Sequence, residues 1–347
     1  MSREPYANIW LQREDRTPRV RLVANPHYWN HARGPRLAEV VFRNDLTPAE
    51  ALERVCDAEG EVDIVTELSP ADARRVEQSG HARLVAIDAV RVVVGVIDRD
   101  STRLPLGDVR ARRALNLALD RAALIRDVFH GHASPLAALA PSAGALKLDR
   151  VLHPFHAPYA HDPDEAAALW GAAGAVPGVP LRIAAPEELE PVARQVAADL
   201  ARALAVAPEI IVYRGVEAKL EARRRLAEKT VPREWDVLIW NQGAQAADGV
   251  ALEIYHAFAG ALGEWRAGPP IPEFDARLAE MQHTTARVAQ ANATHGLDAL
   301  VREEALALFL CAPHALYAVN RHVHFTAYRN TFELAETAVD AEHWSRR

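Results

Sequence analysis

The chain has 347 residues, of which 50% are hydrophobic and 25% are charged, and its formal net charge is −7. This composition is typical of a globular protein with room for about two domains. It argues against nucleic acid as the main partner, because a phosphate-binding surface normally carries a basic excess. No apolar run approaches the roughly 18 residues that cross a bilayer, so we expect no membrane span. Cys56 and Cys311 lie far apart without metal-ligand spacing, which indicates neither a zinc site nor a disulfide framework.

The first part of the chain predicts short strands that alternate with short helices. We expect strands at residues 20–24 and 37–43, where β-branched side chains are frequent. Residues 47–50, Thr-Pro-Ala-Glu, have the cap, proline and acid order of a helix start, and this helix is expected to end before Gly60. A short buried strand over 62–65 and a helix over 69–77 follow.

Residues 84–98 are rich in valine and isoleucine and predict one strand. Two helix starts then occur in tandem, since Asp108 and Asp120 are each a candidate N-cap. Gly131 offers a C-terminal stop. After each cap, apolar side chains recur at helical spacing and predict one buried stripe per helix: Leu115, Ala118, Leu119, Leu124, Ile125 and Val128.

Residues 181–240 give the clearest architecture. We expect strands at 181–184, 209–213 and 235–240, separated by helices at 190–204 and 216–229. The handedness and crossover rules turn such a βαβαβ order into a parallel sheet with helices packed on it.

Two further helices are expected around this core. Asp162 caps a helix over residues 166–173, in front of the stop at Gly174. Near the C-terminus the sequence predicts a long helix over 296–310 and then a strand over 315–319.

In open parallel sheets, ligands gather at the carboxyl ends of strands, which points to the segment after Trp240. There the indole of Trp240 could stack on a ligand, while Asn241 and Gln242 supply paired donors and acceptors. Asp248 follows a few residues later. The alternative is that Trp240 belongs to the core and that the amide-rich segment is only a polar turn.

Residues 108–121 resemble the signature Asp-Val-Arg-x-Arg-x-Ala-Leu-Asn-x-Ala-x-Asp-Arg of the family 5 extracytoplasmic solute-binding proteins, the peptide and nickel receptors of ABC importers. Four more segments resemble motifs of this family in the same order along the chain. They are Asn25-Pro-His-Tyr-Trp29, Gly60-Glu-Val-Asp-Ile64, His161-Asp-Pro-Asp-Glu-Ala166 and Trp235-Asp-Val-Leu-Ile-Trp240. The resemblance therefore covers nearly the whole chain.

The resemblance implies an α/β fold of the two-lobed, periplasmic-binding-protein-like kind (type II, peptide-binding class). Residues 1–95 plus 320–347 would be a remnant of lobe I. Residues 96–319 would be lobe II, with the βαβαβ core at 181–240. Tyr6 matches about the middle of the family pattern, so we expect an incomplete first lobe, which a second chain could complete.

The resemblance also implies a function. A protein of this kind recognises a small organic solute, peptide-like or other, in an interlobe cleft by hinge closure, and docks on an ABC permease. Trp240, Asn241, Gln242 and Asp248 would line that cleft. Gly243 stands near the position where the dipeptide and oligopeptide receptors carry an aspartate for the ligand amino group. Residues 186–188, Pro-Glu-Glu, stand where dipeptide receptors carry an arginine for the ligand carboxylate. A free dipeptide is therefore not favoured.

Family members are periplasmic or lie on the cell surface. The first residues, Met1-Ser-Arg-Glu-Pro-Tyr6, contain no secretory apolar stretch, so we expect no signal peptide and a cytoplasmic protein if Met1 is the native start. The alternative functions are therefore a cytoplasmic ligand-sensing or protein-interaction module derived from this family, or a truncated relative that binds nothing.

Metal binding and catalysis are weaker hypotheses. The 15 histidines include the clusters His130/His132, His153/His156/His161 and His322/His324, whose spacing fits no recognised closed site, so we predict neither a metal nor a cofactor. No nucleophile elbow, HExxH, phosphate loop or GxGxxG occurs, and we predict no enzyme. The acids and bases weighed for catalysis are Asp236, Asp248, Glu253 and His256, of which Asp236 is expected to be structural.

Overall fold

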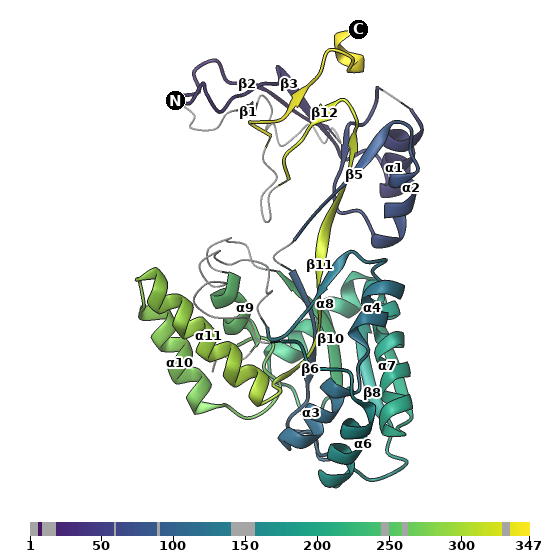
Figure 1. Ribbon diagram of the computed structural model, residues 1–347, viewed down its shortest axis with the longest axis vertical. Coiled ribbons are helices and arrows are strands. Elements are labelled where there is room, and N and C mark those ends of the chain that lie inside the picture. The colour runs from purple at the N-terminus through teal and green to yellow at the C-terminus, as the bar shows by residue number, and fades with distance from the viewer. Residues whose placement is uncertain are drawn as a thin grey trace. The chain divides into compact units, whose positions relative to one another are not determined.

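The computed structural model describes residues 6–8, 19–58, 60–88, 91–139, 157–243, 250–258, 263–327 and 334–347. The chain divides into two compact units. The first is Met1–Ile87 with Ala315–Arg347, and the second is Asp88–His314. The chain therefore passes twice from one unit to the other. Strands and helices are mixed in both units, which is the α/β class that the sequence predicts (Figure 1).

The first unit contains a small antiparallel sheet of β1 (Tyr6–Asn8), β2 (Arg19–Ala24) and β3 (Glu39–Arg43). Its longest described helix is α1 (Pro48–Asp57), which starts with the predicted cap: Thr47 and Glu50 bond each other's backbone amides in a capping box. The other described elements are β4 (Ile64–Val65), a 3₁₀ turn (Pro70–Asp72), α2 (Ala73–Glu77), β5 (Ala82–Asp88), β12 (Val323–His324), β13 (Ala338–Val339) and a 3₁₀ turn (Trp344–Arg346).

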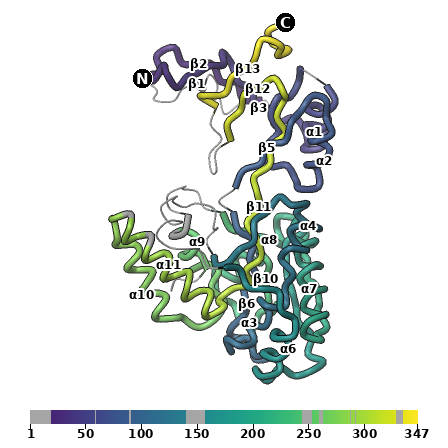
Figure 2. Tube along the Cα trace, viewed as in Figure 1, coloured from purple at the N-terminus to yellow at the C-terminus, as the bar shows by residue number. Residues whose placement is uncertain are grey.

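The second unit is built on a mixed sheet with the strand order β11-β6-β10-β8-β9. These strands are β6 (Arg91–Ile97), β8 (Leu181–Pro186), β9 (Pro208–Tyr213), β10 (Val237–Gly243) and β11 (Ala307–Asn320). β8 is parallel to β9 and to β10, whereas β6 is antiparallel to β10 and to β11. Figure 2 shows β6 and β10 side by side, although about 140 residues separate them in sequence.

Helices cover both faces of this sheet (Figure 1). One core cluster joins the sheet to α3 (Val109–Leu117), α4 (Arg121–Asp127), α6 (Pro163–Ala172) and α7 (Glu190–Leu204). The other joins it to α8 (Gly215–Ala227), α9 (Val250–Phe258), α10 (Pro272–His283) and α11 (Arg287–Glu303). None of the described helices is long and apolar enough to cross a bilayer.

The two tandem helix starts are confirmed. Asp108 accepts a hydrogen bond from the Arg110 amide at 2.8 Å, and Asp120 accepts one from the Ala123 amide at 2.9 Å. Each carboxylate satisfies an amide that has no partner within its helix. Four residues of the predicted stripe, Leu115, Ala118, Leu119 and Leu124, are buried, whereas Ile125 and Val128 are partly buried against the same core.

Two side chains of these helices substitute for a neighbouring strand along part of β11. Asn116 accepts a bond from the Phe309 amide at 3.1 Å and donates to the Ala307 carbonyl at 3.0 Å. Arg121 donates to the Phe309 carbonyl at 2.7 Å and to the Asn116 side chain at 3.0 Å. Backbone groups of a buried strand need partners, and here side chains provide them. Further along β11, the strand β7 (Ala133–Pro135) takes over.

The C-terminal boundary differs from the prediction. The predicted helix over 296–310 is wrong beyond Glu303, because α11 ends there and β11 begins at Ala307. Ala305 has a φ of 45°, a left-handed conformation that stops a helix. The predicted single strand over 84–98 is two strands, β5 and β6, and residues 89–90 between them lie outside the described part of the chain.

Gly95 allows β6 to pack closely against its two neighbouring strands, β10 and β11. A Cβ atom at this position would lie 2.8 Å from Leu308 Cβ and 2.8 Å from Val237 Cγ1. We expect Gly95→Ala to lower the free energy of unfolding by about 1–3 kcal/mol, because the core is overpacked. Gly171→Ala is the matched control, since nothing lies within 4 Å of its added Cβ in α6. In urea unfolding, Gly171→Ala should lose no stability and should gain up to ~1 kcal/mol. Equal changes in the free energy of unfolding for the two variants would contradict this account.

Candidate functional site

The predicted ligand residues lie where β10 ends. Side chains alternate along this strand, so Trp240 and Gln242 share one face and Asn241 lies on the other. Trp240 is half-buried and Asn241 is exposed. The side-chain amide of Gln242 donates through Nε2 to the Gly243 carbonyl at 3.3 Å. Asp248 lies outside the described residues.

Trp240 is held by other aromatic rings. Its indole lies 4.9 Å from that of Trp265, centroid to centroid, at an interplanar angle of 39°. Trp265 in turn stacks on Phe258 at 6.0 Å. Both partners are buried in the second core cluster, whereas Trp240 keeps part of its surface exposed. Trp240 therefore packs on the core and keeps part of its surface exposed, and its stacking on a solute stays a prediction.

Lys229 holds the loop that carries Trp265. Its ammonium group donates to the carbonyls of Gly263, Glu264 and Arg266, at 3.0 Å and 3.1 Å for the last two. Burial, followed by the nearby Arg266 and Arg233 guanidinium groups, lowers the pKa of Lys229 to about 8. The loop whose Trp265 packs on Trp240 is therefore held by a lysine that burial makes easier to deprotonate.

The lowered pKa of Lys229 predicts a pH dependence. Between about pH 8 and the ordinary lysine value, the unfolded chain still binds a proton that the folded chain has lost, so stability rises with pH. We expect the unfolding free energy of the native chain, minus that of Lys229→Met, to increase from pH 8 to pH 10 in urea titrations.

Lys219→Met is the control for this prediction. The ion pair with Glu188 raises the pKa of Lys219, so its contribution to stability is retained until the pH exceeds the usual lysine range. The corresponding difference for Lys219→Met should stay flat between pH 8 and pH 10. A flat or falling difference for Lys229→Met would contradict the assignment.

A group that the sequence does not reveal lies on β7 and β11. The imidazole Nε2 of His314 is 3.2 Å from Ser134 Oγ and 3.6 Å from Asp88 Oδ1. Burial lowers the pKa of His314, against the opposing effect of Asp88. Both contacts use the same nitrogen, so the imidazole does not relay a proton from serine to carboxylate as a catalytic triad does. The pairing of β7 with β11 brings Ser134 close to His314, and Asp88 stands at the end of β5, which also pairs with β11.

The structure also places the histidines and Asp236. In the described ranges, no three histidine, cysteine or acidic side chains lie close enough to hold a metal ion. His322 lies 3.1 Å from Asp340, whereas His153 and His156 are outside those ranges.

Asp236 is fully buried and accepts bonds from the Arg103 and Arg182 guanidinium groups and from the Arg182 amide, at 2.8–3.3 Å. Its role is structural, as expected from its place within an apolar strand.

Comparisons with known proteins identify the family of the chain and proteins of similar fold. Residues 11–254 match the family model described as bacterial extracellular solute-binding proteins, family 5 Middle. The chain is 27% identical over 164 residues to the dipeptide-binding protein of Escherichia coli K12. Its fold is similar to that of the ABC transporter substrate-binding protein CtaP from Listeria monocytogenes, with a TM-score of 0.79, 15% identity and 96% of this chain covered. It is also similar to a dipeptide-binding protein from Pseudoalteromonas sp. SM9913 in complex with Met-Leu, with a TM-score of 0.69, 17% identity and 97% covered.

The chain spans only part of each of these relatives. The match to the Escherichia coli protein covers 47% of this chain and 29% of that protein. The two solved structures are covered over 66% and 64% of their length.

Proposed function

This chain belongs to the bacterial extracellular solute-binding proteins of family 5, and on that premise we propose that it binds a small organic solute and presents it to the permease of an ABC importer. The proposed place of action is the periplasm or the cell surface, where such receptors work. The proposed ligand residues are Trp240, Asn241, Gln242 and Asp248.

The observation that carries the proposal is the double passage of the chain between two compact units. A chain that crosses twice between two units can change their arrangement by rotating a few backbone bonds near the two crossings. A solute bound at the end of β10 favours a closed state only if that state gives it additional contacts. Hinge closure then reports to the permease that the solute is bound.

The residues after β8 bear on the class of solute. Glu188 pairs with Lys219 at 2.8 Å, and Glu187 accepts a bond from the Gly215 amide at 3.4 Å. These positions carry carboxylates where the dipeptide receptors are expected to carry an arginine. Since Lys219 is already paired with Glu188, neither position offers a free peptide carboxylate a cation with which to form an ion pair. We therefore propose a longer peptide, a peptide without a free C-terminus, or another neutral solute in place of a dipeptide.

A thermal-shift screen of the whole chain tests the proposal. The probes are free dipeptides, C-terminally amidated dipeptides, tetrapeptides, opines and sugars. A ligand at a hundredfold excess over its dissociation constant stabilises the native state by about 2.7 kcal/mol, which raises the melting temperature. We expect amidated dipeptides or tetrapeptides to do so and free dipeptides not to.

The best probe of the screen is then titrated while tryptophan fluorescence is followed. Trp240→Phe should abolish most of the fluorescence change, because the ring of Trp240 is the proposed stacking surface. Trp29→Phe is the control, since Trp29 is an exposed tryptophan of the other unit. A fluorescence change that survives Trp240→Phe and disappears in Trp29→Phe would overturn the assignment.

A further inference from the structure

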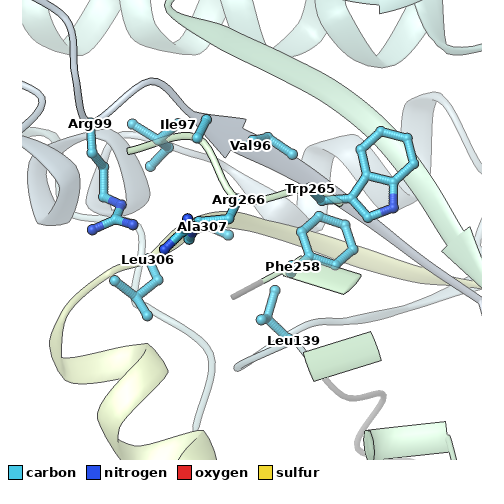
Figure 3. Close-up of a pocket in the computed structure, with 10 residues that line it drawn as sticks. Val96, Ile97, Arg99, Leu139, Phe258, Trp265, Arg266, Leu306 and Ala307 are labelled. Atoms are coloured by element: carbon cyan, nitrogen blue, oxygen red, sulfur yellow. The ribbon is translucent and has the colours of Figure 1, made fainter. Parts of the chain in front are cut away.

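A small cavity in the second unit lies against the aromatic rings that hold Trp240, since Phe258 and Trp265 both line it. It is lined by the end of β6, the start of β11 and the loop after α9, and it includes Val96, Arg99, Phe258 and Arg266 (Figure 3). Val96 pairs with Leu238 at the beginning of β10, four residues before Gln242. Trp240 lies two residues beyond Leu238, about 7 Å along the strand, and its ring partner Trp265 forms part of the cavity wall. Its volume is about 20 Å³.

Arg266 brings unsatisfied donors to this cavity. Its Nε and Nη1 atoms are both buried and have no hydrogen-bond partner among the residues that the structure describes. Buried polar atoms of this kind are rare in native proteins, and each calls for a bound water or ion. A guanidinium group cannot lose its proton at physiological pH, so its charge remains in the cavity wall.

Arg99 adds a second positive charge. Its Nη2 donates to the Pro269 carbonyl at 2.8 Å, which is a neutral partner. Burial, followed by the Arg112 guanidinium group, lowers the pKa of Arg99 to about 10, and Arg266 acts in the same direction. Gly268 is packed so closely on Arg99 that an added Cβ would lie 2.6 Å from Arg99 Cβ. The side chain is thus held beside the cavity.

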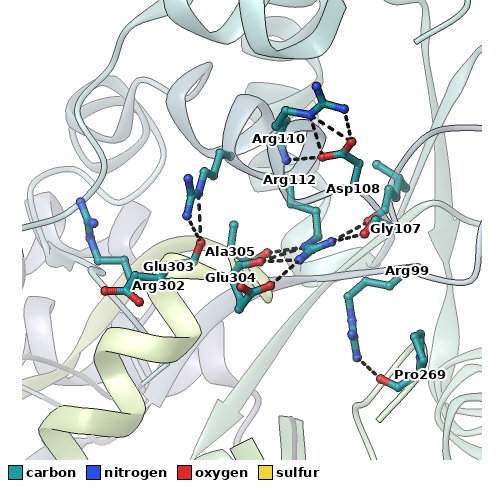
Figure 4. A network of polar contacts seen from close by, with 12 residues as sticks. Arg99, Gly107, Asp108, Arg110, Arg112, Pro269, Arg302, Glu303, Glu304 and Ala305 are labelled. Atoms are coloured by element: carbon teal, nitrogen blue, oxygen red, sulfur yellow. Dashed lines mark hydrogen bonds and ion pairs between the residues drawn. The ribbon is translucent and has the colours of Figure 1, made fainter. Parts of the chain in front are cut away.

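The carboxylates nearby are already engaged. Glu304 lies 3.4 Å from Arg112, whose guanidinium group also binds the carbonyls of Glu304, Ala305 and Gly107 (Figure 4). Asp100 pairs with Arg233 at 3.3 Å, and Glu264 pairs with Arg223. Asp100 and Glu304 raise the pKa of Arg99, but among the described residues no acid forms an ion pair with Arg99 or with Arg266.

We propose that this cavity binds one small inorganic anion, of the size of chloride, between Arg99 and Arg266. A volume of about 20 Å³ holds a single group of about the size of a water molecule, which favours a monatomic anion. A water molecule would satisfy the free donors but would add no negative charge beside the two guanidinium groups, whereas an anion does both. The proposal does not rest on the solute-binding function, because the anion would contact Arg99 and Arg266 and not the residues at the end of β10; the two places share Trp265, which lines the cavity and packs on Trp240.

The experiment compares sodium chloride with sodium gluconate at equal ionic strength, since gluconate is too large for the cavity. The melting temperature of the native chain should be higher in 100 mM chloride, by roughly 2 to 4 °C, and the shift should saturate. Arg266→Met and Arg99→Met should each abolish the difference. Arg126→Met, which removes an equal charge from an exposed pair with Asp127, should retain it.

Chlorine-35 NMR provides a readout that does not require a variant to melt like the native chain. Native protein should broaden the chloride line, and excess bromide should reverse the broadening, whereas excess gluconate should not. Equal melting temperatures in the two salts, together with no line broadening, would overturn the proposal. So would a chloride effect that persists in both Arg266→Met and Arg99→Met.

Discussion

Asn116→Ala is expected to lower the free energy of unfolding by about 4 kcal/mol, one of the two largest effects of any single substitution considered for this chain. Asn116 is fully buried, and its side chain makes four hydrogen bonds, two of them to β11 and one to Arg121. The alanine variant leaves the Phe309 amide and the Ala307 carbonyl without partners. Each buried group without a partner costs about 1–3 kcal/mol.

Urea unfolding of the whole chain measures this loss. Asn241→Ala is the matched control, because Asn241 is exposed at the end of β10 and should change stability by no more than about 0.5 kcal/mol. A loss of less than ~1.5 kcal/mol for Asn116→Ala would show that water or a backbone shift replaces the side chain. The strand substitution by Asn116 and Arg121 would then be wrong.

Asp236→Ala is expected to cost about 3–4 kcal/mol of unfolding free energy. The carboxylate has no solvent exposure and accepts bonds from two arginines and from the Arg182 backbone amide. Removing one partner of a buried ion pair typically costs 3–5 kcal/mol. The arginines remain partly exposed, with 35% and 20% of their side-chain surfaces accessible, so the lower part of that range is expected.

Asp127→Ala serves as the comparison for Asp236→Ala. Asp127 also pairs with an arginine, Arg126 at 2.7 Å, but both side chains are about half exposed or more. Exposed pairs contribute little, so the loss should not exceed ~0.5 kcal/mol in the same urea experiment. Similar losses for both variants would mean that burial is not what makes Asp236 important.

The contacts of Asn116 and of its neighbours also explain what the family signature at residues 108–121 does. Asp108 and Asp120 cap two helices, Asn116 and Arg121 satisfy β11, and Arg112 binds carbonyls at the end of α11. Each of these side chains serves the backbone. The signature therefore indicates the fold, and the solute must be sought elsewhere in the chain.

The sequence predicts those parts of the fold that depend on neighbouring residues. The caps at Thr47, Asp108 and Asp120 are local interactions, and α7 begins and ends where the pattern predicts, at Glu190 and Leu204. Residues 307–310 are different, because they carry a helix-compatible pattern. They form a strand since β6 pairs with them on one side and Asn116 and Arg121 bind them on the other. No local pattern contains that information.

The site shows the same limit. Strand-end reasoning identifies Trp240, Asn241 and Gln242 as candidates, and these assignments remain predictions. It misses Trp265, which fixes the ring of Trp240, and Lys229, which fixes the loop of Trp265, because both contacts join segments far apart in sequence. Buried arginines without acidic partners, such as Arg266, also cannot be recognised from a sequence in which arginine is common.

The central claim is that the end of β10 binds a small solute. The most direct measurement is a calorimetric titration of the whole chain with the amidated dipeptide or tetrapeptide that raises the melting temperature most. We predict saturable binding of one molecule per chain, weakened at least tenfold by Asn241→Ala and by Gln242→Ala, and unchanged by Gln282→Ala in α10. Equal affinities of the native chain and both β10 variants would contradict the account.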